Sequence, residues 1–302
     1  MPIALVKSLH IYPIKSCRGI EVTTLNFGVR GPRFDREWMI VDRVTGKFLS
    51  QREIPALTKV IPRISENSLS LRIGIPQLND RLAELEISLA IDSDPNPSDR
   101  PSNLPRKLPD EPASHPIEVS VWESRGPMAV EEATAVSQAF SDFVQRPVRF
   151  VRMAKNYQRR MKSKYGFQDR SLSFVDDMPT LLVSMSSLRD LNVRLPEPIA
   201  IDQFRPNIVI DDAPGISAKL SAFAEDHWQQ IHIGQMLFDA TKSCTRCIIV
   251  TTNQHTAERN PEVLKVLASY RRDENSKVVF GRYLVHGQNG VLRVGDPVIL
   301  GA

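Results

Sequence analysis

Residues 244–252 read CTRCIIVTT, which joins a Cys-x-x-Cys pair to a run of apolar and β-branched residues. Because such a run favours an extended backbone, we predict a strand over residues 247–251 with both thiols at its start. Lys242 and Arg246 lie beside the thiols in the sequence. Neighbouring positive charge lowers the pKa of a thiol and favours the thiolate, so this stretch is the first candidate for chemistry.

Four interpretations of the cysteine pair stay open from the residues alone. A zinc site would need Cys17 and one of the six histidines, and no second ligand pair at zinc-site spacing supports it. A redox dithiol would favour a helix, rather than the predicted strand, after the cysteines. A loop that presents one thiolate suits a transition metal, for which a thiolate is a soft ligand. Two small buried residues without a function are the simplest alternative.

Short segments of β-branched and aromatic residues extend from this stretch in both directions. We predict strands over residues 5–11, 20–27, 38–41, 69–73, 85–91, 117–122, 148–151, 208–210, 231–233, 278–284 and 291–300. Apolar residues at helical spacing predict helices over residues 130–144, 184–195 and 260–271, with Ser184 as an N-cap and Asn260-Pro261 opening the last. The pattern predicts an α+β, predominantly β chain. We expect two β-rich, barrel-like domains with a few short helices, over residues 1–150 and 151–302.

The composition limits the class of protein. The chain has 302 residues, of which 41% are hydrophobic and 25% are charged, which is typical of a globular protein and excludes collagen, coiled coils and bulk disorder. Three cysteines are too few for a disulfide-framed secreted domain. No apolar run is long enough for a transmembrane anchor. We therefore expect a soluble cytoplasmic protein, with mitochondrial association as the alternative.

Charge and proline are distributed unevenly. A net charge of +4 is too small to indicate a nucleic-acid partner. Residues 92–115 are rich in proline, and we predict a surface insertion in the first domain, with an interdomain linker as the alternative. Residues 152–165 carry six cations and no acidic residue. That segment is either a solvated loop or a docking surface for an acidic partner or an anion.

Three further stretches offer groups for binding an anion. Lys15 and Ser16 follow the first predicted strand and provide a charge and a hydroxyl. Arg36 precedes the strand over residues 38–41. Arg205 and Asn207 precede the strand over residues 208–210, and a guanidinium fork with an amide suits a phosphate or the edge of a heterocycle. Alone, the first stretch is more typical of an ordinary polar turn, the second also fits a surface ion-pair ladder, and the third is a weak signal.

The combination and order of these motifs resemble the MOSC family. The matching stretches are YPIKS at 12–16, RFDREW at 33–38, FRPN at 204–207, EDHW at 225–228, CTRCI at 244–248 and VGDPV at 294–298. Nearly the whole chain resembles the two-domain form, with an N-terminal MOSC β-barrel domain, to which the mitochondrial amidoxime-reducing components belong.

The resemblance implies a molybdenum cofactor (Mo-molybdopterin), a pterin dithiolene with a phosphate tail, held between the two domains. It implies that Cys247 is the metal ligand and the catalytic residue. The residues that it implies for cofactor binding are Lys15, Ser16, Arg36, Arg205, Asn207, Thr245, Arg246 and Tyr283. The chain departs from its animal relatives at Asp177-Met178-Pro179, where they carry hydroxyl residues before the proline, so side-chain hydrogen bonds from this loop to the cofactor are not expected.

The resemblance also implies an activity. We expect a molybdenum-dependent reductase of N-hydroxylated small molecules, such as amidoximes and hydroxylamines. Electrons would come from an external donor such as cytochrome b5 with its reductase, and the segment over residues 152–164 is a candidate docking surface because complementary charge accelerates association. The alternative is a non-enzymatic carrier of the molybdenum cofactor or of sulfur.

Overall fold

The computed structural model describes residues 1–65, 68–74, 82–88, 116–167, 169–212 and 219–301. The chain divides into two units that interleave in the sequence. The barrel unit comprises Met1–Glu37, Ser50–Lys59 and Gln158–Ala302, and the sheet unit comprises Trp38–Leu49 and Val60–Tyr157. The first strand pairs with strands of the C-terminal half, so the barrel unit contains both ends of the chain.

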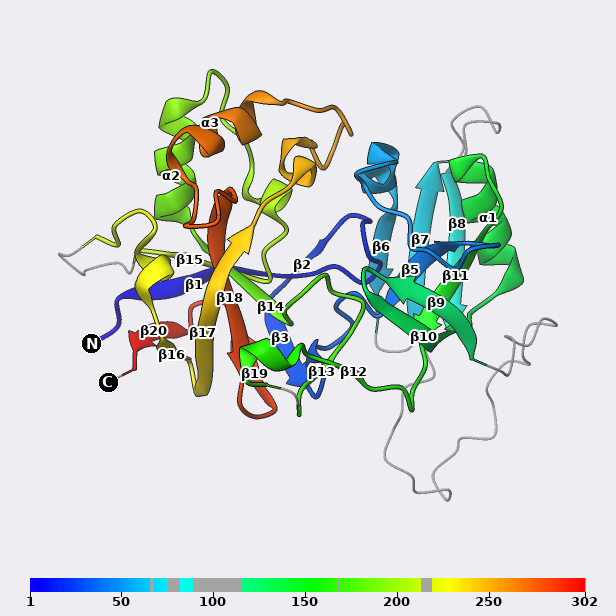
Figure 1. The fold of residues 1–302 in the computed structure, drawn as a ribbon, viewed down its shortest axis with the longest axis horizontal. Helices are drawn as coiled ribbons and strands as arrows, with labels where there is room; N and C mark the ends of the chain where they lie inside the picture. Colours follow the sequence, from blue (N-terminus) through cyan, green and yellow to red (C-terminus); the bar gives the residue numbers. More distant parts are fainter. Residues whose placement is uncertain (66–67, 75–81, 89–115, 168, 213–218, 302) are drawn as a thin grey trace. The chain divides into compact units, whose positions relative to one another are not determined.

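Seven strands close the barrel unit (Figure 1). Their order is β15 (Ile208–Asp211), β14 (Thr180–Ser184), β18 (Val279–His286), β17 (Met236–Thr245), β16 (Gln230–Ile233), β20 (Pro297–Leu300) and β1 (Ala4–Ile11). Pairing of β1 with β15 completes the ring, so these strands have no unpaired edge. β14 and β15 pair in parallel, and the helix α2 (Met185–Arg194) connects them.

Smaller elements complete the barrel unit. β2 (Ile20–Val22) extends the sheet beside β1. A three-stranded sheet consists of β19 (Gly290–Arg293), β3 (Thr24–Gly28) and β4 (Gly31–Pro32), and β12 (Arg159–Arg160) pairs with β13 (Ser171–Leu172). The 3-10 turns are η1 (Pro55–Lys59), η3 (Ser163–Tyr165), η4 (Ile201–Phe204), η5 (Ala224–His227) and η6 (Ile248–Thr251).

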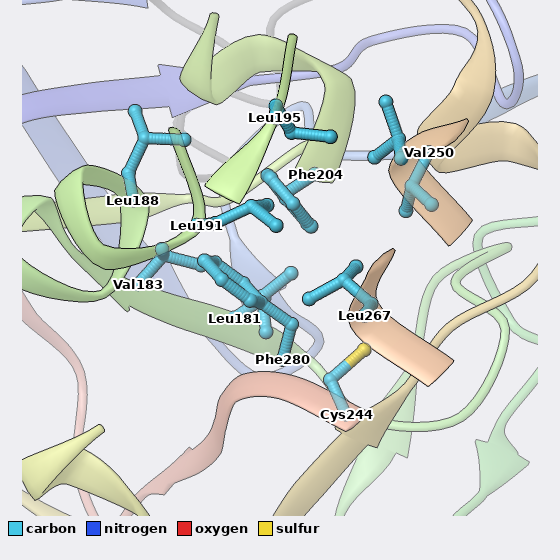
Figure 2. Packing of buried hydrophobic residues seen from close by; sticks show 11 residues of the cluster. Leu181, Val183, Leu188, Leu191, Leu195, Phe204, Cys244, Val250, Leu267 and Phe280 are labelled. Carbon is cyan, nitrogen blue, oxygen red and sulfur yellow. The ribbon is translucent and has the colours of Figure 1, made fainter. Parts of the chain in front are cut away.

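A buried apolar cluster lies between the barrel and its helices (Figure 2). Every residue of β14 is buried, as expected for a strand that is covered on both faces. Leu188 and Leu191 of α2 and Leu267 of α3 (Glu262–Tyr270) pack into this cluster. Phe204 stacks on Phe280 with ring centroids 4.0 Å apart. Phe204 immediately precedes Arg205 in the sequence. The cluster therefore fixes the backbone that carries this arginine.

The sheet unit is antiparallel. Its four-stranded sheet has the order β5 (Trp38–Asp42), β11 (Val148–Met153), β10 (Ser124–Glu131) and β9 (Ile117–Val121). A second sheet contains β6 (Ile61–Ile64), β7 (Ser68–Gly74) and β8 (Leu82–Ser88). The helix α1 (Thr134–Val144) packs on β11, where Phe140 stacks on Phe150.

The structure confirms a predominantly β, α+β fold, with three α-helices among the described residues. The expected strands over 20–27 and 291–300 are each two strands, and the expected helix over 130–144 begins only at Thr134. Of the expected strand over 85–91, residues 85–88 belong to β8, and residues 89–91 lie outside the described residues. The proline-rich stretch over 92–115 lies outside the described residues. None of the described helices has the length and apolar character needed to cross a membrane.

The strand predicted over residues 247–251 is wrong, because a 3-10 turn, η6, occupies Ile248–Thr251. The preceding strand, β17, was not predicted and ends at Thr245. Thr251 Oγ1 donates a hydrogen bond to the Ile248 carbonyl at 2.7 Å, and Val250 is buried in the cluster of Figure 2. Packing of this short apolar run therefore overrides its β propensity.

Candidate cofactor site

All nine residues predicted to bind the cofactor belong to the barrel unit. They lie in the loops after β1 and before β5, at the junction of η4 and β15, at the end of β17, and on β18. Three of them, Ser16, Arg36 and Arg205, have φ angles of 70°, 48° and 55°. A non-glycine residue with positive φ carries backbone strain, which is common at functional sites.

Two of the predicted arginines converge on Tyr12. The Cζ atoms of Arg36 and Arg205 lie 4.2 Å and 4.3 Å from the centroid of its ring. Such contacts hold a guanidinium group by attraction to the π electrons while leaving its edge free for hydrogen bonds. The Tyr12 hydroxyl donates to the Pro206 carbonyl at 3.0 Å, so the ring itself is fixed. Tyr12 is a site residue that the sequence analysis did not identify.

Arg36 is paired with a buried carboxylate. Its Nη1 donates to both oxygens of Asp35, at 2.8 Å and 2.6 Å. Burial alone would lower the pKa of Arg36, but the charge of Asp35 outweighs burial and the pKa is raised. Arg36 also donates to the Arg205 carbonyl at 3.3 Å and lies 3.4 Å from Asn207 Oδ1. The structure therefore brings Arg36, Arg205 and Asn207 together.

Arg205 has a different environment. It is only 9% exposed, and its Nη1 donates to the Cys17 carbonyl at 2.7 Å and to Gln254 Oε1 at 3.2 Å. Within the described ranges no carboxylate pairs with it, and its buried Nη2 has no hydrogen-bond partner. Burial, followed by the nearby charge of Arg36, lowers its pKa to about 10. Arg205 is therefore a buried cation, charged at neutral pH, with one buried donor group that has no partner in the described ranges.

The Asn207 amide is already engaged by the protein. Its Oδ1 accepts from the Leu181 amide at 3.1 Å, and its Nδ2 donates to the His10 carbonyl at 3.2 Å. These bonds connect the start of β15 with β1 and β14. Asn207 thus fixes the strands behind Arg205.

Lys15 is a buried cation. Its Nζ donates to the Phe174 carbonyl at 2.7 Å and forms an ion pair with Asp176. Burial lowers its pKa to about 8, against the opposing charge of Asp176. Arg52 shares the same carboxylate at 3.4 Å. Because the Phe174 amide donates to the Arg36 carbonyl at 2.8 Å, Lys15 and Arg36 contact the same segment.

The three cysteines differ in access. Cys17 is fully buried, and burial raises its pKa to about 12, so that it is a neutral thiol. Cys244 is also buried, and its Sγ accepts a hydrogen bond from Arg246 Nη1 at 2.8 Å. Cys247, just before η6, is partly exposed. Among the three cysteines, Cys247 is therefore the one that is not buried.

The other residues predicted for the site lie near Cys244 and Cys247. Thr245 is exposed at the end of β17. Arg246 Nη2 donates to the Phe204 carbonyl at 2.6 Å, and its Nε has no partner in the described ranges. The pKa of Tyr283 is raised well above its usual value, first by burial and then by Cys244. Tyr283 therefore faces Cys244.

Lys242, the second cation near the thiols in the sequence, is engaged elsewhere. Its Nζ pairs with Asp177 and donates to the Tyr165 hydroxyl at 2.7 Å. Met178, in the same loop as Asp177, is buried. This loop therefore places the carboxylates of Asp176 and Asp177 against Lys15 and Lys242.

The cation-rich segment over residues 152–164 spans both units and is not uniformly exposed. Arg159 is buried and donates to the carbonyls of Ser173 and Val175, at 2.8 Å and 2.6 Å. Arg160, Lys162 and Lys164 of the barrel unit are exposed. A docking role is thus a hypothesis for these three cations, while Arg159 supports the loop.

Two buried amides complete the surroundings of Arg205. Gln51 and Gln254 exchange hydrogen bonds at 3.1 Å and 3.2 Å. No motif marked either residue in the sequence, since 203 positions separate them. In the described part of the chain, no group of three or more His, Cys, Asp or Glu side chains could hold a metal ion. The zinc interpretation with Cys17, Cys244 and Cys247 therefore gains no support.

Two protein-family models match this chain. A model of the MOSC N-terminal beta barrel domain matches residues 3–147, and a model of the MOSC domain matches residues 169–299. The mitochondrial amidoxime reducing component 2 of Rattus norvegicus is 30% identical, over 97% of this chain and 82% of the relative. The chain belongs to the MOSC family. Its two matched regions cover most of the sequence.

The chain is also similar to a second amidoxime-reducing component, to a molybdenum cofactor sulfurase and to a solved bacterial structure. Mitochondrial amidoxime-reducing component 1 of Mus musculus is 29% identical, over 98% of this chain and 82% of the relative. A molybdenum cofactor sulfurase of Botryotinia fuckeliana is 28% identical over 98% of this chain, which spans only 41% of that relative. A crystal structure of the YUAD protein from Bacillus subtilis has a TM-score of 0.36 and 10% identity, over 98% of this chain and 93% of that chain.

Proposed function

We propose that this chain is a molybdenum-cofactor-dependent reductase of N-hydroxylated compounds, such as amidoximes and hydroxylamines. The observation that carries the proposal is Arg205, a buried guanidinium group without a carboxylate partner and with a free Nη2 in the described ranges. A buried, unpaired charge is costly unless a ligand compensates it. The phosphate of a pterin cofactor is an anion that would do so, and the residues present fit this group.

Each predicted residue has a distinct role in this proposal. Arg205 supplies uncompensated positive charge to the phosphate end, and the ion-paired cations Arg36 and Lys15, with the Ser16 segment, lie beside it. Asn207 holds the strands that carry Arg205. Cys247 supplies the thiolate for the metal. Thr245 and Arg246 lie at the end of β17, and Tyr283 lies on the neighbouring strand β18. When bound, the molybdenum cofactor supplies two-electron oxygen-atom chemistry.

The electrons are proposed to come from a separate protein, such as cytochrome b5 with its reductase. The exposed cations Arg160, Lys162 and Lys164 support this choice, because an acidic donor would be attracted to them. All three cysteines are free, which suits a reducing compartment such as the cytoplasm.

A second candidate is a non-enzymatic carrier of the molybdenum cofactor or of sulfur. The similarity to molybdenum cofactor sulfurases supports it, because it uses the same cations and the same thiol. A reductase converts many substrate molecules per chain, whereas a carrier binds the cofactor and converts none. The test is the reduction of benzamidoxime by the chain purified from a host that makes the cofactor, with a viologen reductant as the electron source. Multiple turnovers support the reductase, while cofactor-loaded protein without turnover supports the carrier and contradicts our first proposal.

A further inference from the structure

Gln51 and Gln254 form a buried amide pair beside Arg205. Gln51 Nε2 donates to Gln254 Oε1 at 3.1 Å, and Gln254 Nε2 donates to Gln51 Oε1 at 3.2 Å. The two residues are 0% and 3% exposed. Neither belongs to the nine residues assigned to the cofactor above, and both bring fixed polar groups to the site.

The pair is fully hydrogen-bonded. Gln51 Nε2 also donates to the Ser16 carbonyl at 2.8 Å, and Gln254 Nε2 also donates to the Thr252 carbonyl at 3.1 Å. Gln254 Oε1 accepts from Arg205 Nη1 at 3.2 Å. If the Gln254 amide were flipped, its NH2 group would face the N–H donor of Arg205 Nη1. The hydrogen bonds therefore define the orientation of the Gln254 amide. The pair thus connects Arg205 to Ser16 and to the segment after η6.

An amide at residue 254 affects the charge of Arg205 differently from a carboxylate at the same position. A carboxylate at residue 254 would accept the same hydrogen bond but would also neutralise Arg205, as Asp35 pairs with Arg36. The amide accepts the bond without cancelling the charge. Arg205 Nη1 is thereby fixed while Nη2 stays free and the cation stays uncompensated.

We propose that Gln254, held by Gln51, is a positioning residue that orients Arg205 for an anionic group and preserves its charge for that group. This inference rests on the proposed cofactor site, because it takes the phosphate of the cofactor as the anion. Gln254 does not contact the reacting atoms, and its effect passes through Arg205.

The test compares Gln254→Glu with the wild type, both purified from a cofactor-making host. The substitution keeps the shape and the acceptor, replaces the Nε2 donor to Gln51 and Thr252 with an oxygen, and adds a charge next to Arg205. For charges a few ångströms apart at an effective dielectric constant near 20, we expect molybdenum and pterin per chain to fall by roughly tenfold or more. Lowering the pH should restore part of the binding as the new carboxyl group becomes protonated.

Gln203→Met is the matched control. Gln203 is a second buried glutamine of the barrel unit, and its Nε2 donates to the Val250 carbonyl at 2.7 Å rather than to Arg205. We expect this control to lower the melting temperature with little change in cofactor content. If Gln254→Glu does not fold, Gln254→Met removes the acceptor without adding charge, and an occupancy loss greater than that of Gln203→Met is expected. Equal occupancy at a similar melting temperature would overturn the inference.

A second measurement separates this inference from the proposed function. Protein made without cofactor is titrated with inorganic phosphate, and the rise in melting temperature reports binding. We expect stabilisation of the wild type and little or none of Gln254→Glu. Wild-type protein that binds phosphate but never contains molybdenum would contradict the proposed function and leave the positioning role supported. Identical phosphate responses in wild type and Gln254→Glu would contradict the positioning role.

Discussion

Arg246 donates a hydrogen bond from Nη1 to the Sγ atom of Cys244, at 2.8 Å. The cation that the sequence places between the two cysteines therefore serves the buried thiol rather than Cys247. Cys244 packs in the apolar cluster of Figure 2, while Cys247 is partly exposed just before η6. We therefore propose a structural role for Cys244 and keep Cys247 as the candidate metal ligand.

Cys244→Ala tests that assignment. The substitution removes a buried sulfur and leaves Arg246 Nη1 without its partner, so we expect the free energy of unfolding to fall by about 1–3 kcal/mol. We expect molybdenum per chain to stay near the wild-type value. Denaturant unfolding and metal analysis measure both quantities. A loss of molybdenum without a loss of stability would make Cys244 a ligand and contradict the assignment.

Lys15 predicts a pH dependence of cofactor retention. Burial lowers its pKa to about 8, so its charge, and its attraction for an anion, are lost as the pH rises through 8. The half-life of cofactor release should therefore shorten between pH 7 and pH 9. Lys15→Arg keeps its charge over this range and should show a flatter profile. The same shortening in Lys15→Arg would show that another group is responsible.

The effect of Lys15 on folding has the opposite direction. Because its pKa is lower in the folded than in the unfolded chain, its contribution to stability is present above the unfolded pKa and is lost as the pH falls through about 8. Relative to the neutral variant Lys15→Met, the wild-type protein should become more stable as the pH rises from 8 towards 10. Denaturant unfolding at these two values measures the change.

Glu225 predicts a pH dependence of stability. It is fully buried in η5, where its carboxyl group contacts the hydroxyl groups of Ser184 and Ser187 at 2.8–3.1 Å. Burial raises its pKa, so its contribution to stability is present below the unfolded pKa and is lost as the pH rises through the folded value. Glu225→Gln mimics the protonated form and should raise the free energy of unfolding at pH 8 by roughly 1 kcal/mol.

The comparison for Glu225 uses unfolding at pH 5 and pH 8. The difference between the two pH values should be smaller in Glu225→Gln than in the wild type. Glu225→Ala, which removes the hydrogen bonds, should be less stable at both. A Glu225→Gln protein less stable than the wild type at pH 8 would mean that the buried carboxylate is favourable in its charged form.

The exposed cations predict how an acidic electron donor binds. Arg160→Glu combined with Lys164→Glu should lower the second-order rate of reduction by cytochrome b5 about tenfold at low salt, with a smaller effect at high salt. Stopped-flow absorbance measures this rate. Arg159→Met is the contrasting variant, because the loss of two hydrogen bonds to carbonyls should reduce stability instead. If the rate of reduction changes neither with salt concentration nor with charge reversal, the segment over residues 152–164 is excluded as the docking surface.

The sequence predicted the elements whose pattern is local. Ser184 caps α2 by accepting from the Ser187 amide, and Asn260 Oδ1 accepts from the Glu262 amide at the start of α3, as expected. The apolar run over 247–251 was assigned to the wrong element because four or five apolar residues fit a strand or a helical turn equally well. Burial of Val250 against α3 decides between them.

The site was predictable only in part, for a related reason. Charged residues such as Arg36 and Arg205 are visible in a sequence as unusual groups at strand ends. Tyr12 and Gln254 are ordinary residues, and their roles depend on contacts between segments that meet only in the folded chain. The 203 positions between Gln51 and Gln254 leave no local signal of their reciprocal hydrogen bonds.

The central claim is that Cys247 holds molybdenum in this chain. The most direct measurement is the molybdenum-to-protein ratio of wild type, Cys247→Ala and Cys244→Ala, purified side by side from a cofactor-making host. We predict a ratio approaching one for the wild type, a similar value for Cys244→Ala, and a loss of tenfold or more for Cys247→Ala. A Cys247→Ala protein that is folded and retains the wild-type ratio would contradict the account.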